Sequence, residues 1–205
     1  MFVVSIDGPD GSGKTTVANL LLNELRQRFT RFKIIRTELP SQMVTGTFTK
    51  ILRNSADTIS PEVFALTYAA DHLHHWQEFM QGLPKDSIVV QERSLLSTII
   101  YQGILGKIDM KWLKEINKYC PNRPDLTIIL RVPMEIQITR EFGESGHDIF
   151  EKRDHVEKQT KVYYDLPEDL KNEYSAIVVD GSGTPAEVAK RCADIIEKAV
   201  KVKGI

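Results

Sequence analysis

The chain has 205 residues, of which 41% are hydrophobic and 27% are charged, and its formal net charge is −1. This length fits one domain with a proper core, and the near-neutral charge gives no overall attraction to a nucleic-acid polymer or an anionic membrane. Two cysteines without C-x-x-C spacing, no signal-peptide pattern and no apolar run of about 18 residues predict a cytoplasmic protein without disulfides, a zinc site or a membrane span.

The stretch near the start carries the most specific signal. Residues 2–6 are typical of a strand, and Gly8-Pro9-Asp10-Gly11-Ser12-Gly13-Lys14-Thr15 has the spacing G-x-x-x-x-G-K-T of a phosphate-binding loop. The glycines let backbone N–H groups surround a polyphosphate, and the helix that follows adds its positive N-terminal end. We expect Lys14 to reach the β- and γ-phosphates and the Thr15 hydroxyl to ligate Mg²⁺.

The rest of the chain alternates between strand and helix patterns. Four more apolar runs predict strands, at residues 33–37, 87–91, 126–130 and 176–179. Helical patterns cover residues 17–25, 48–52, 61–81, 93–105, 109–119, 133–140, 150–170 (with a break at Pro167) and 185–199. This alternation indicates an α/β fold in which helices cover both faces of a parallel sheet, and residues 1–205 are expected to form a single domain.

Two polar stripes suggest a second binding surface. Arg93, Ser97 and Tyr101 are spaced by four, which predicts that they line one face of a helix. A guanidinium, a hydroxyl and a phenol suit a surface that grips phosphate, base and sugar together. On the preceding helix, Tyr68 and His72 are also four apart and would offer a stacking ring beside a hydrogen-bond donor. The alternative is that both stripes are ordinary solvated or packed helix faces.

Two glycines interrupt the helical pattern between Arg140 and Arg153, and residues 141–153 are predicted to form a mobile lid. Such lids close over phosphoryl-transfer sites and often bring a cation to the transferring group. The candidate cations are Arg140, Lys152 and Arg153. A solvated charged loop is the alternative, because four acidic residues lie among these cations.

Together these motifs resemble the thymidylate kinase family of nucleoside monophosphate kinases over nearly the whole chain. Residues 7–16, D-G-P-D-G-S-G-K-T-T, are similar to the family's E-G-x-D-G-S-G-K-T-T, and residues 68–72, Y-A-A-D-H, are similar to F-A-A-D-R. Residues 92–103 are similar to D-R-Y-x-x-S-x-x-A-Y-Q-G, the most specific element. The resemblance implies a three-layer P-loop NTPase fold with a five-stranded parallel sheet and a small lid. It also implies ATP-dependent phosphorylation of dTMP to dTDP with Mg²⁺, in a homodimer.

The resemblance assigns roles to individual residues. The nucleotide is expected on Gly8, Pro9, Asp10, Gly11, Ser12, Gly13, Lys14, Thr15, Thr16, Asp180, Gly181 and Ser182. The acceptor dTMP is expected on Glu38, Lys50 (or Arg53), Tyr68, His72, Arg93, Ser97, Tyr101 and Gln102. Mg²⁺ is expected on Thr15 directly and on Glu92 through water. The catalytic groups are expected to be Lys14, Asp10 and Arg93 with the lid cations Arg140, Lys152 and Arg153.

Some positions differ from the family pattern. His72 stands where the family has an arginine that contacts thymine O4, Glu92 replaces an aspartate, and Arg131 occupies another aspartate position. Gly11 stands where some phosphate-binding loops carry an arginine, so the cation needed during transfer is expected to come from the lid.

Three other functions stay open at this point. A deoxyribonucleoside kinase would use Glu38 as a base toward the 5′-hydroxyl of the nucleoside. A related kinase would act on another pyrimidine monophosphate, and a degenerate protein would hold nucleotide without transferring phosphate. A GTP switch is disfavoured, because the sequence lacks an N-K-x-D motif that would read the base.

Overall fold

A parallel sheet forms the centre of the computed structural model, which describes residues 1–53, 58–142 and 149–204. Its strands are β1 (Phe2–Asp7), β2 (Lys33–Glu38), β3 (Ser87–Glu92), β4 (Leu126–Arg131) and β5 (Ala176–Asp180). The strand order β2-β3-β1-β4-β5 places β1 at the centre, between β3 and β4. All five strands predicted from the sequence are confirmed, as is the α/β fold class.

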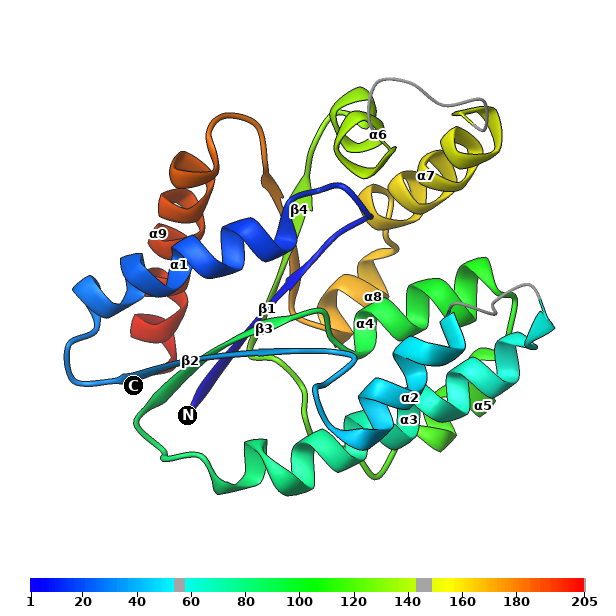
Figure 1. Cartoon of the computed structure of the whole chain (residues 1–205). Helices are drawn as coiled ribbons and strands as arrows, with labels where there is room; N and C mark the ends of the chain where they lie inside the picture. The colour runs from blue at the N-terminus through cyan, green and yellow to red at the C-terminus, as the bar shows by residue number, and fades with distance from the viewer. Residues whose placement is uncertain (54–57, 143–148, 205) are drawn as a thin grey trace.

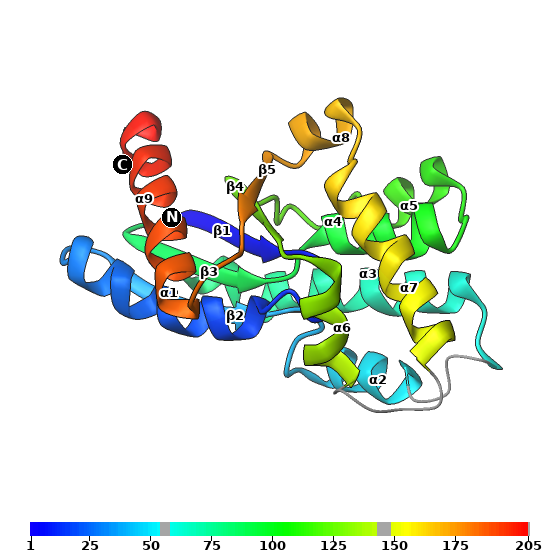
Figure 2. The same cartoon turned by 90° about the horizontal axis from the view of Figure 1, so that it is seen from above.

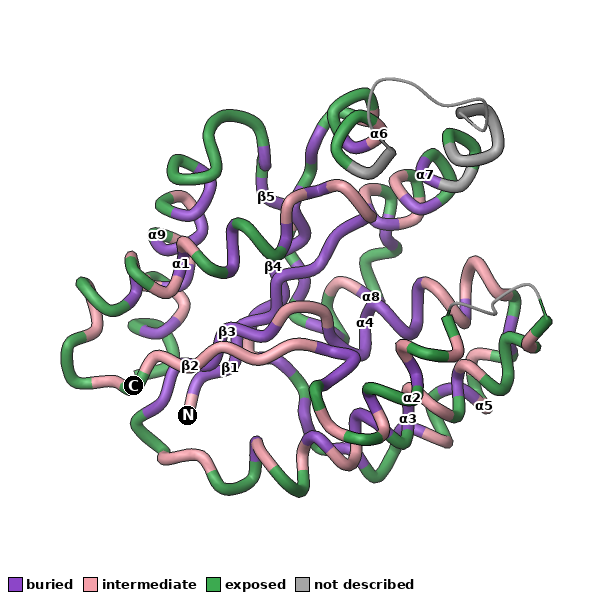
Figure 3. The backbone as a smooth tube through the Cα atoms, viewed as in Figure 1, coloured by how far each residue is buried: buried purple, intermediate pink, exposed green. Residues whose placement is uncertain are grey.

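Helices cover both faces of this sheet, so the fold has three layers (Figures 1 and 2). On one face, α1 (Lys14–Arg28) and α9 (Pro185–Lys203) pack together on the central strands around a core that includes Val4, Leu21 and Ile196. The other face and its surroundings carry α2 (Val44–Arg53), α3 (Pro61–Glu78), η2 (Met80–Gly82), α4 (Leu95–Thr98), the π-helix η3 (Ile99–Leu105), α5 (Met110–Ile116), α6 (Met134–Phe142), α7 (Ile149–Tyr164) and α8 (Glu168–Glu173). Because β1 is covered on both sides, it is buried along its whole length (Figure 3), and this burial explains its apolar sequence.

The helix boundaries follow from capping residues. Ser60 accepts a hydrogen bond from the backbone N–H of Val63, and Pro61 begins α3, as the sequence predicts. α9 begins with a capping box in which Thr184 and Glu187 bond each other's backbone N–H groups. The predicted break at Pro167 separates α7 from α8.

Within the described part of the chain, none of the helices has both the length and the apolar composition needed to span a bilayer.

The predicted helix over residues 93–105 is wrong in one respect. Ser94 is the N-cap, since its side chain accepts from the N–H of Leu96, and α4 begins only at Leu95. Arg93 therefore lies before the helix, in the left-handed region with φ of 66°. After Thr98 the chain continues as a π-helix, whose turn is wider than that of an α-helix. Arg93, Ser97 and Tyr101 consequently do not lie on one α-helical face.

Candidate active site

Two cavities open at the carboxyl end of the sheet, where parallel α/β folds bind ligands. The first has a volume of about 560 Å³ and is lined by residues 10–17 of the phosphate-binding loop and α1, together with Glu92, Arg93, Arg140, Gly181, Gly183, Pro185 and Val188. The second has a volume of about 260 Å³ and is lined by Asp10, Leu39, Pro40, Arg53, Phe64, Tyr68, His72, Arg93, Ser94, Ser97, Thr98, Tyr101 and Gln102. Asp10 and Arg93 line both cavities, so the two sites meet at this pair.

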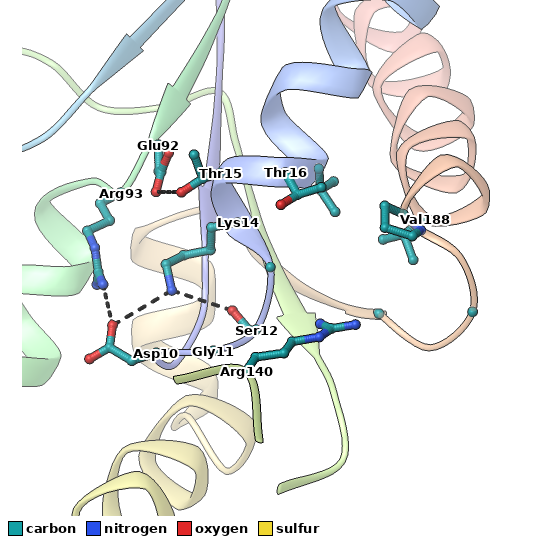
Figure 4. Close-up of a pocket in the computed structure, with 15 residues that line it drawn as sticks. Asp10, Gly11, Ser12, Lys14, Thr15, Thr16, Glu92, Arg93, Arg140 and Val188 are labelled. Atoms are coloured by element: carbon teal, nitrogen blue, oxygen red, sulfur yellow. Dashed lines mark hydrogen bonds and ion pairs between the residues drawn. The ribbon is translucent and has the colours of Figure 1, made fainter. Parts of the chain in front are cut away.

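The phosphate-binding loop has the backbone that its glycines permit. Gly8, Gly11 and Gly13 have φ of 144°, 73° and 85°, a region that residues with a Cβ rarely adopt. Lys14 starts α1 and folds back under the loop, where its Nζ donates to the carbonyl oxygen of Pro9 at 2.7 Å. The same Nζ lies 3.9 Å from the Asp10 carboxylate (Figure 4). The loop thus holds the buried amino group of Lys14 close to the Asp10 carboxylate.

We expect Lys14 to make nucleotide binding depend on pH. Burial and the nearby Arg93 charge lower the pKa of Lys14 to about 7. Bound phosphates would favour the ammonium form and raise this pKa, so binding takes up a proton above pH 7. Affinity is therefore complete below pH 7 and falls as pH rises, by up to about tenfold per pH unit.

Titration calorimetry at pH 8, in two buffers that differ in ionisation enthalpy, will measure this proton uptake. Lys14→Arg is the matched control, because a guanidinium stays protonated throughout this range. Equal pH dependence of ATP affinity in wild type and Lys14→Arg would contradict the expectation.

Gly11 is packed directly against α6. A Cβ at Gly11 would overlap the backbone carbonyl of Gln137 in α6, and the φ of 73° would strain any L-residue. This contact gives a physical reason why the loop carries no arginine at this position.

We expect Gly11→Ala to lower the free energy of unfolding by about 1–3 kcal/mol and to weaken ATP binding. Denaturant melts and calorimetry will measure both quantities. Gly82→Ala is the control, since a Cβ there would meet nothing within 4 Å. Equal stability of the two variants would show that the contact with Gln137 imposes no constraint.

The residues predicted to bind metal lie together. The Thr15 hydroxyl donates to Glu92 Oε1 at 2.6 Å, and Arg36 holds the other oxygen, Glu92 Oε2, at 2.8 Å. Among the described residues, no group of three or more His, Cys, Asp or Glu side chains forms a protein-only metal cage. One hydroxyl and one carboxylate fit Mg²⁺, which keeps several waters and shares substrate phosphates as ligands.

Arg93 is the charged group between the two cavities. Its guanidinium donates to Asp10 Oδ1 at 2.5 Å and lies 5.4 Å from the ring centre of Tyr101. Burial alone would lower the pKa of Arg93, but Tyr101 and Asp10 hold it well above its ordinary value. Although burial opposes ionisation of Asp10, Arg93 and Lys14 keep the pKa of this carboxyl below its ordinary value. Both members of the pair are therefore charged.

The second cavity combines rings with a neutral imidazole. Tyr68 and Phe64 reach it from successive turns of α3, together with His72. Burial lowers the pKa of His72 to about 4, so its ring is neutral at physiological pH and offers one donor. The sequence interpretation missed Phe64, although its spacing of four from Tyr68 was a usable signal.

Ser97 and Tyr101, two predicted acceptor-binding residues that also line the second cavity, already make hydrogen bonds within the protein. The hydroxyl of Ser97 donates to the buried carboxylate of Asp7 and lies 3.1 Å from the hydroxyl of Tyr163. Tyr101 donates to Gln159 Oε1 at 3.1 Å. Asp7, whose other oxygen accepts from Ser5 and Ser94, was not predicted to have this structural role.

The structure brings Arg53 rather than Lys50 to the second cavity. Lys50 is not among the described residues that line either cavity, and its Nζ lies 3.2 Å from Glu38 Oε1. Glu38 also accepts from Arg36 and Gln42 and does not line either cavity. Glu38 is the last residue of β2, and Lys50 lies in α2. Arg53 lies one turn further along α2, at its last position.

The loop after β5 contributes backbone rather than side chains. Gly181 and Gly183 line the first cavity, whereas the Asp180 carboxylate turns back to accept from the N–H and hydroxyl of Ser182. Arg191 of α9 donates to the carbonyl oxygen of Asp180 and fixes the loop. Arg131, at the end of β4, lies 5.0 Å from the ring centre of Tyr164 and is not among the lining residues.

The predicted lid is described only at its two ends. α6 carries Arg140 into the first cavity, where its guanidinium points toward Val188 and away from Asp10 (Figure 4). Arg153 in α7 is exposed and is not among the lining residues. Residues 143–148 and the side chain of Lys152 lie outside the described part of the chain.

Replacing Arg140, Lys152 and Arg153 singly by alanine tests whether the lid supplies the transfer cation. We expect at least one variant to lower kcat with dTMP sharply, on the order of 10³-fold, because a cation at the transferring group contributes effects of that size. Steady-state ADP release will measure kcat and both KM values. Three mild effects on kcat would refute a lid cation.

Comparison with known proteins agrees with this geometry. The sequence model of a family described as thymidylate kinase matches residues 6–191. A probable thymidylate kinase of Pyrobaculum aerophilum is 33% identical over 99% of this chain and 100% of its own length, and probable thymidylate kinase 1 of Saccharolobus solfataricus is 33% identical over 96% and 97%. In fold, the chain is similar to the crystal structure of thymidylate kinase from Ehrlichia chaffeensis, with a TM-score of 0.70, 22% identity and coverage of 96% and 98%. The chain belongs to the thymidylate kinase family.

Proposed function

We propose that this protein transfers the γ-phosphoryl group of ATP to dTMP, giving dTDP and ADP, with Mg²⁺ as the metal. The observation that carries the proposal is the meeting of two cavities at Asp10 and Arg93. One cavity has the phosphate-binding loop of a nucleotide donor site, and the other has the aromatic and polar lining of a small acceptor site. A GTP switch needs one nucleotide site, whereas a kinase needs two adjacent sites.

The chain's own residues supply positioning and charge. Lys14 and the loop N–H groups would hold the donor phosphates, Thr15 and Glu92 would hold Mg²⁺, and Arg93 would hold the acceptor phosphate. Mg²⁺, when bound, neutralises charge on the donor phosphates. An oxygen of the acceptor phosphate forms the new bond to the γ-phosphorus while the bond to the β-phosphate oxygen breaks. Because that acceptor oxygen is ionised at neutral pH, the protein needs no strong general base.

The acceptor cavity favours a nucleotide over a nucleoside. A nucleoside kinase needs a free carboxylate near the 5′-hydroxyl, but Glu38 is paired with Lys50 and Arg36 outside the cavity. Among the described residues that line the second cavity, Asp10 is the one with a carboxylate, and its ion pair with Arg93 makes it a poor base. Arg53 and Arg93 together outweigh the charge of Asp10, which leaves a positive balance suited to a phosphate.

A panel of acceptors tests the proposal. ADP release with dTMP, dUMP, dCMP and thymidine, each with ATP and Mg²⁺, is expected to be fastest with dTMP and negligible with thymidine. Faster turnover of thymidine would replace the proposal with a nucleoside kinase. Binding of ATP without ADP release for any acceptor would indicate a non-catalytic protein.

We also propose that the protein acts as a homodimer in the cytoplasm, where its buried cysteines would stay reduced. Exposed apolar residues support the dimer: Val44, Phe48 and Ile51 of α2 and Val63 and Leu66 of α3 are exposed, and α2 packs against α3. The α2 residues recur at the spacing of one helical face. Sedimentation should give twice the chain mass for wild type and a monomer for Phe48→Glu. A monomeric wild type would refute the dimer.

A further inference from the structure

Arg93 adopts a backbone conformation that needs support. Its φ of 66° is unusual for a residue with a long side chain and costs on the order of 1–3 kcal/mol unless its surroundings impose it. Two bonds hold its backbone: the N–H donates to the carbonyl oxygen of Ile6 at 3.0 Å, and the carbonyl oxygen accepts from Gln91 Nε2 at 2.9 Å. The Ile6 bond comes from the sheet itself, whereas the Gln91 bond comes from a side chain.

Gln91 is an unexpected residue at its position. It is only 1% exposed and lies in β3 next to Val89 and Val90, which are fully buried. A buried amide is costly unless both of its ends are hydrogen-bonded. Its Oε1 accepts from Asn122 Nδ2 at 2.8 Å, and its Nε2 serves Arg93. Thus both polar ends of this amide are used.

The orientation of the Gln91 amide is fixed by chemistry. A backbone carbonyl can only accept, so Nε2 must face Arg93 and Oε1 must face Asn122. Asn122 is itself 6% exposed and presents its NH₂ group to Gln91, although its own Oδ1 has no partner among the described residues. The Arg93 carbonyl oxygen is thus hydrogen-bonded, while Asn122 Oδ1 is left without a partner among the described residues. A buried polar atom left unpaired argues that the Gln91–Asn122 pair does more than fill the core.

We propose that Gln91, oriented by Asn122, is a positioning residue that holds the Arg93 backbone so that its guanidinium lies between the two cavities. The consequence is specific: loss of the Gln91 bond should weaken binding of the acceptor phosphate far more than binding of ATP, because the remaining residues that line the first cavity do not depend on this bond. This inference rests on the proposed function, in which Arg93 binds the phosphate of dTMP.

The test uses Gln91→Met, which keeps the length of the side chain and removes its donor. We expect both KM and the calorimetric Kd for dTMP to rise about tenfold, the effect of losing roughly one buried hydrogen bond, and KM for ATP to change less than about twofold. Asn122→Ala should act in the same direction and serves if Gln91→Met does not fold. Ser87→Ala is the matched control, since Ser87 is buried on the same strand face and its hydroxyl has no partner among the described residues.

A double-mutant cycle with Arg93→Ala separates positioning from general stability. If Gln91 acts through Arg93, Gln91→Met should weaken dTMP binding less than about twofold further in the Arg93→Ala background. A full tenfold further loss there, or unchanged dTMP affinity in Gln91→Met alone, would overturn the inference. Absence of dTMP-dependent ADP release from wild type would instead refute the proposed function.

Discussion

Lys14→Met is expected to lower kcat by more than about 10³-fold while the protein stays folded. The Nζ of Lys14 lies in the phosphate-binding loop, close to Pro9 O and the Asp10 carboxylate, and in the proposed function it holds the donor phosphates. Methionine replaces the unbranched stem of lysine, one atom shorter, and carries no charge. ADP release with dTMP measures the loss, and calorimetry with ATP measures the weakened donor binding.

The folded state itself should tolerate this change. Lys14 is 6% exposed, and its lowered pKa shows that burial penalises the charge when no nucleotide is bound. Since the pKa is about 7 in the folded protein against 10.5 in the unfolded chain, the wild type gains stability as pH rises from 7 to 10.5. Lys14→Met should lack this rise. Turnover near the wild-type value in a folded Lys14→Met variant would refute the assignment of the loop as the donor site.

Arg93→Ala is expected to lower kcat/KM for dTMP by about 10³-fold. Arg93 lines both cavities and its guanidinium pairs with Asp10 at 2.5 Å, and in the proposed function it binds the acceptor phosphate and neutralises charge during transfer. Arg93→Lys should recover only part of the activity, because an ammonium group cannot make the paired contacts of a guanidinium.

The control for Arg93 is another arginine at a strand end. Arg131 is the last residue of β4, lies over the ring of Tyr164 and is not among the described residues that line a cavity, so Arg131→Ala should retain activity within about twofold. Steady-state kinetics with dTMP and ATP varied separately will locate each effect. If Arg93→Ala kept more than about a tenth of wild-type kcat/KM, another residue would have to bind the acceptor phosphate.

Much of the fold was predictable because its signals are local. The strands are apolar runs that need burial on both faces, and the helix starts at Ser60 and Pro61 follow from capping and the fixed φ of proline. The phosphate-binding loop was predictable for the same reason, since its function depends on glycines and a lysine at fixed separations along the chain.

The acceptor side was predictable only in part. Tyr68 and His72 reach one cavity because both lie on α3, where a spacing of four places side chains on one face. The same argument was wrong for Arg93, because the cap at Ser94 stops the helix before it and the π-helix changes the period after Thr98. Arg53 reaches the cavity in place of Lys50, which Glu38 holds elsewhere, and no local pattern distinguishes those two cations.

The sequence by itself determined the α/β class, the strand positions, the loop with G-x-x-x-x-G-K-T spacing and the family, because each depends on residues that are close along the chain. The tertiary structure alone decided which distant side chains meet. It placed Gln137 against Gly11, Asp7 beneath Ser97, and Gln91 with Asn122 behind Arg93. These contacts arise where helices and loops from different parts of the chain converge on the carboxyl end of the sheet. Their partners are therefore set by packing in three dimensions rather than by spacing in the sequence.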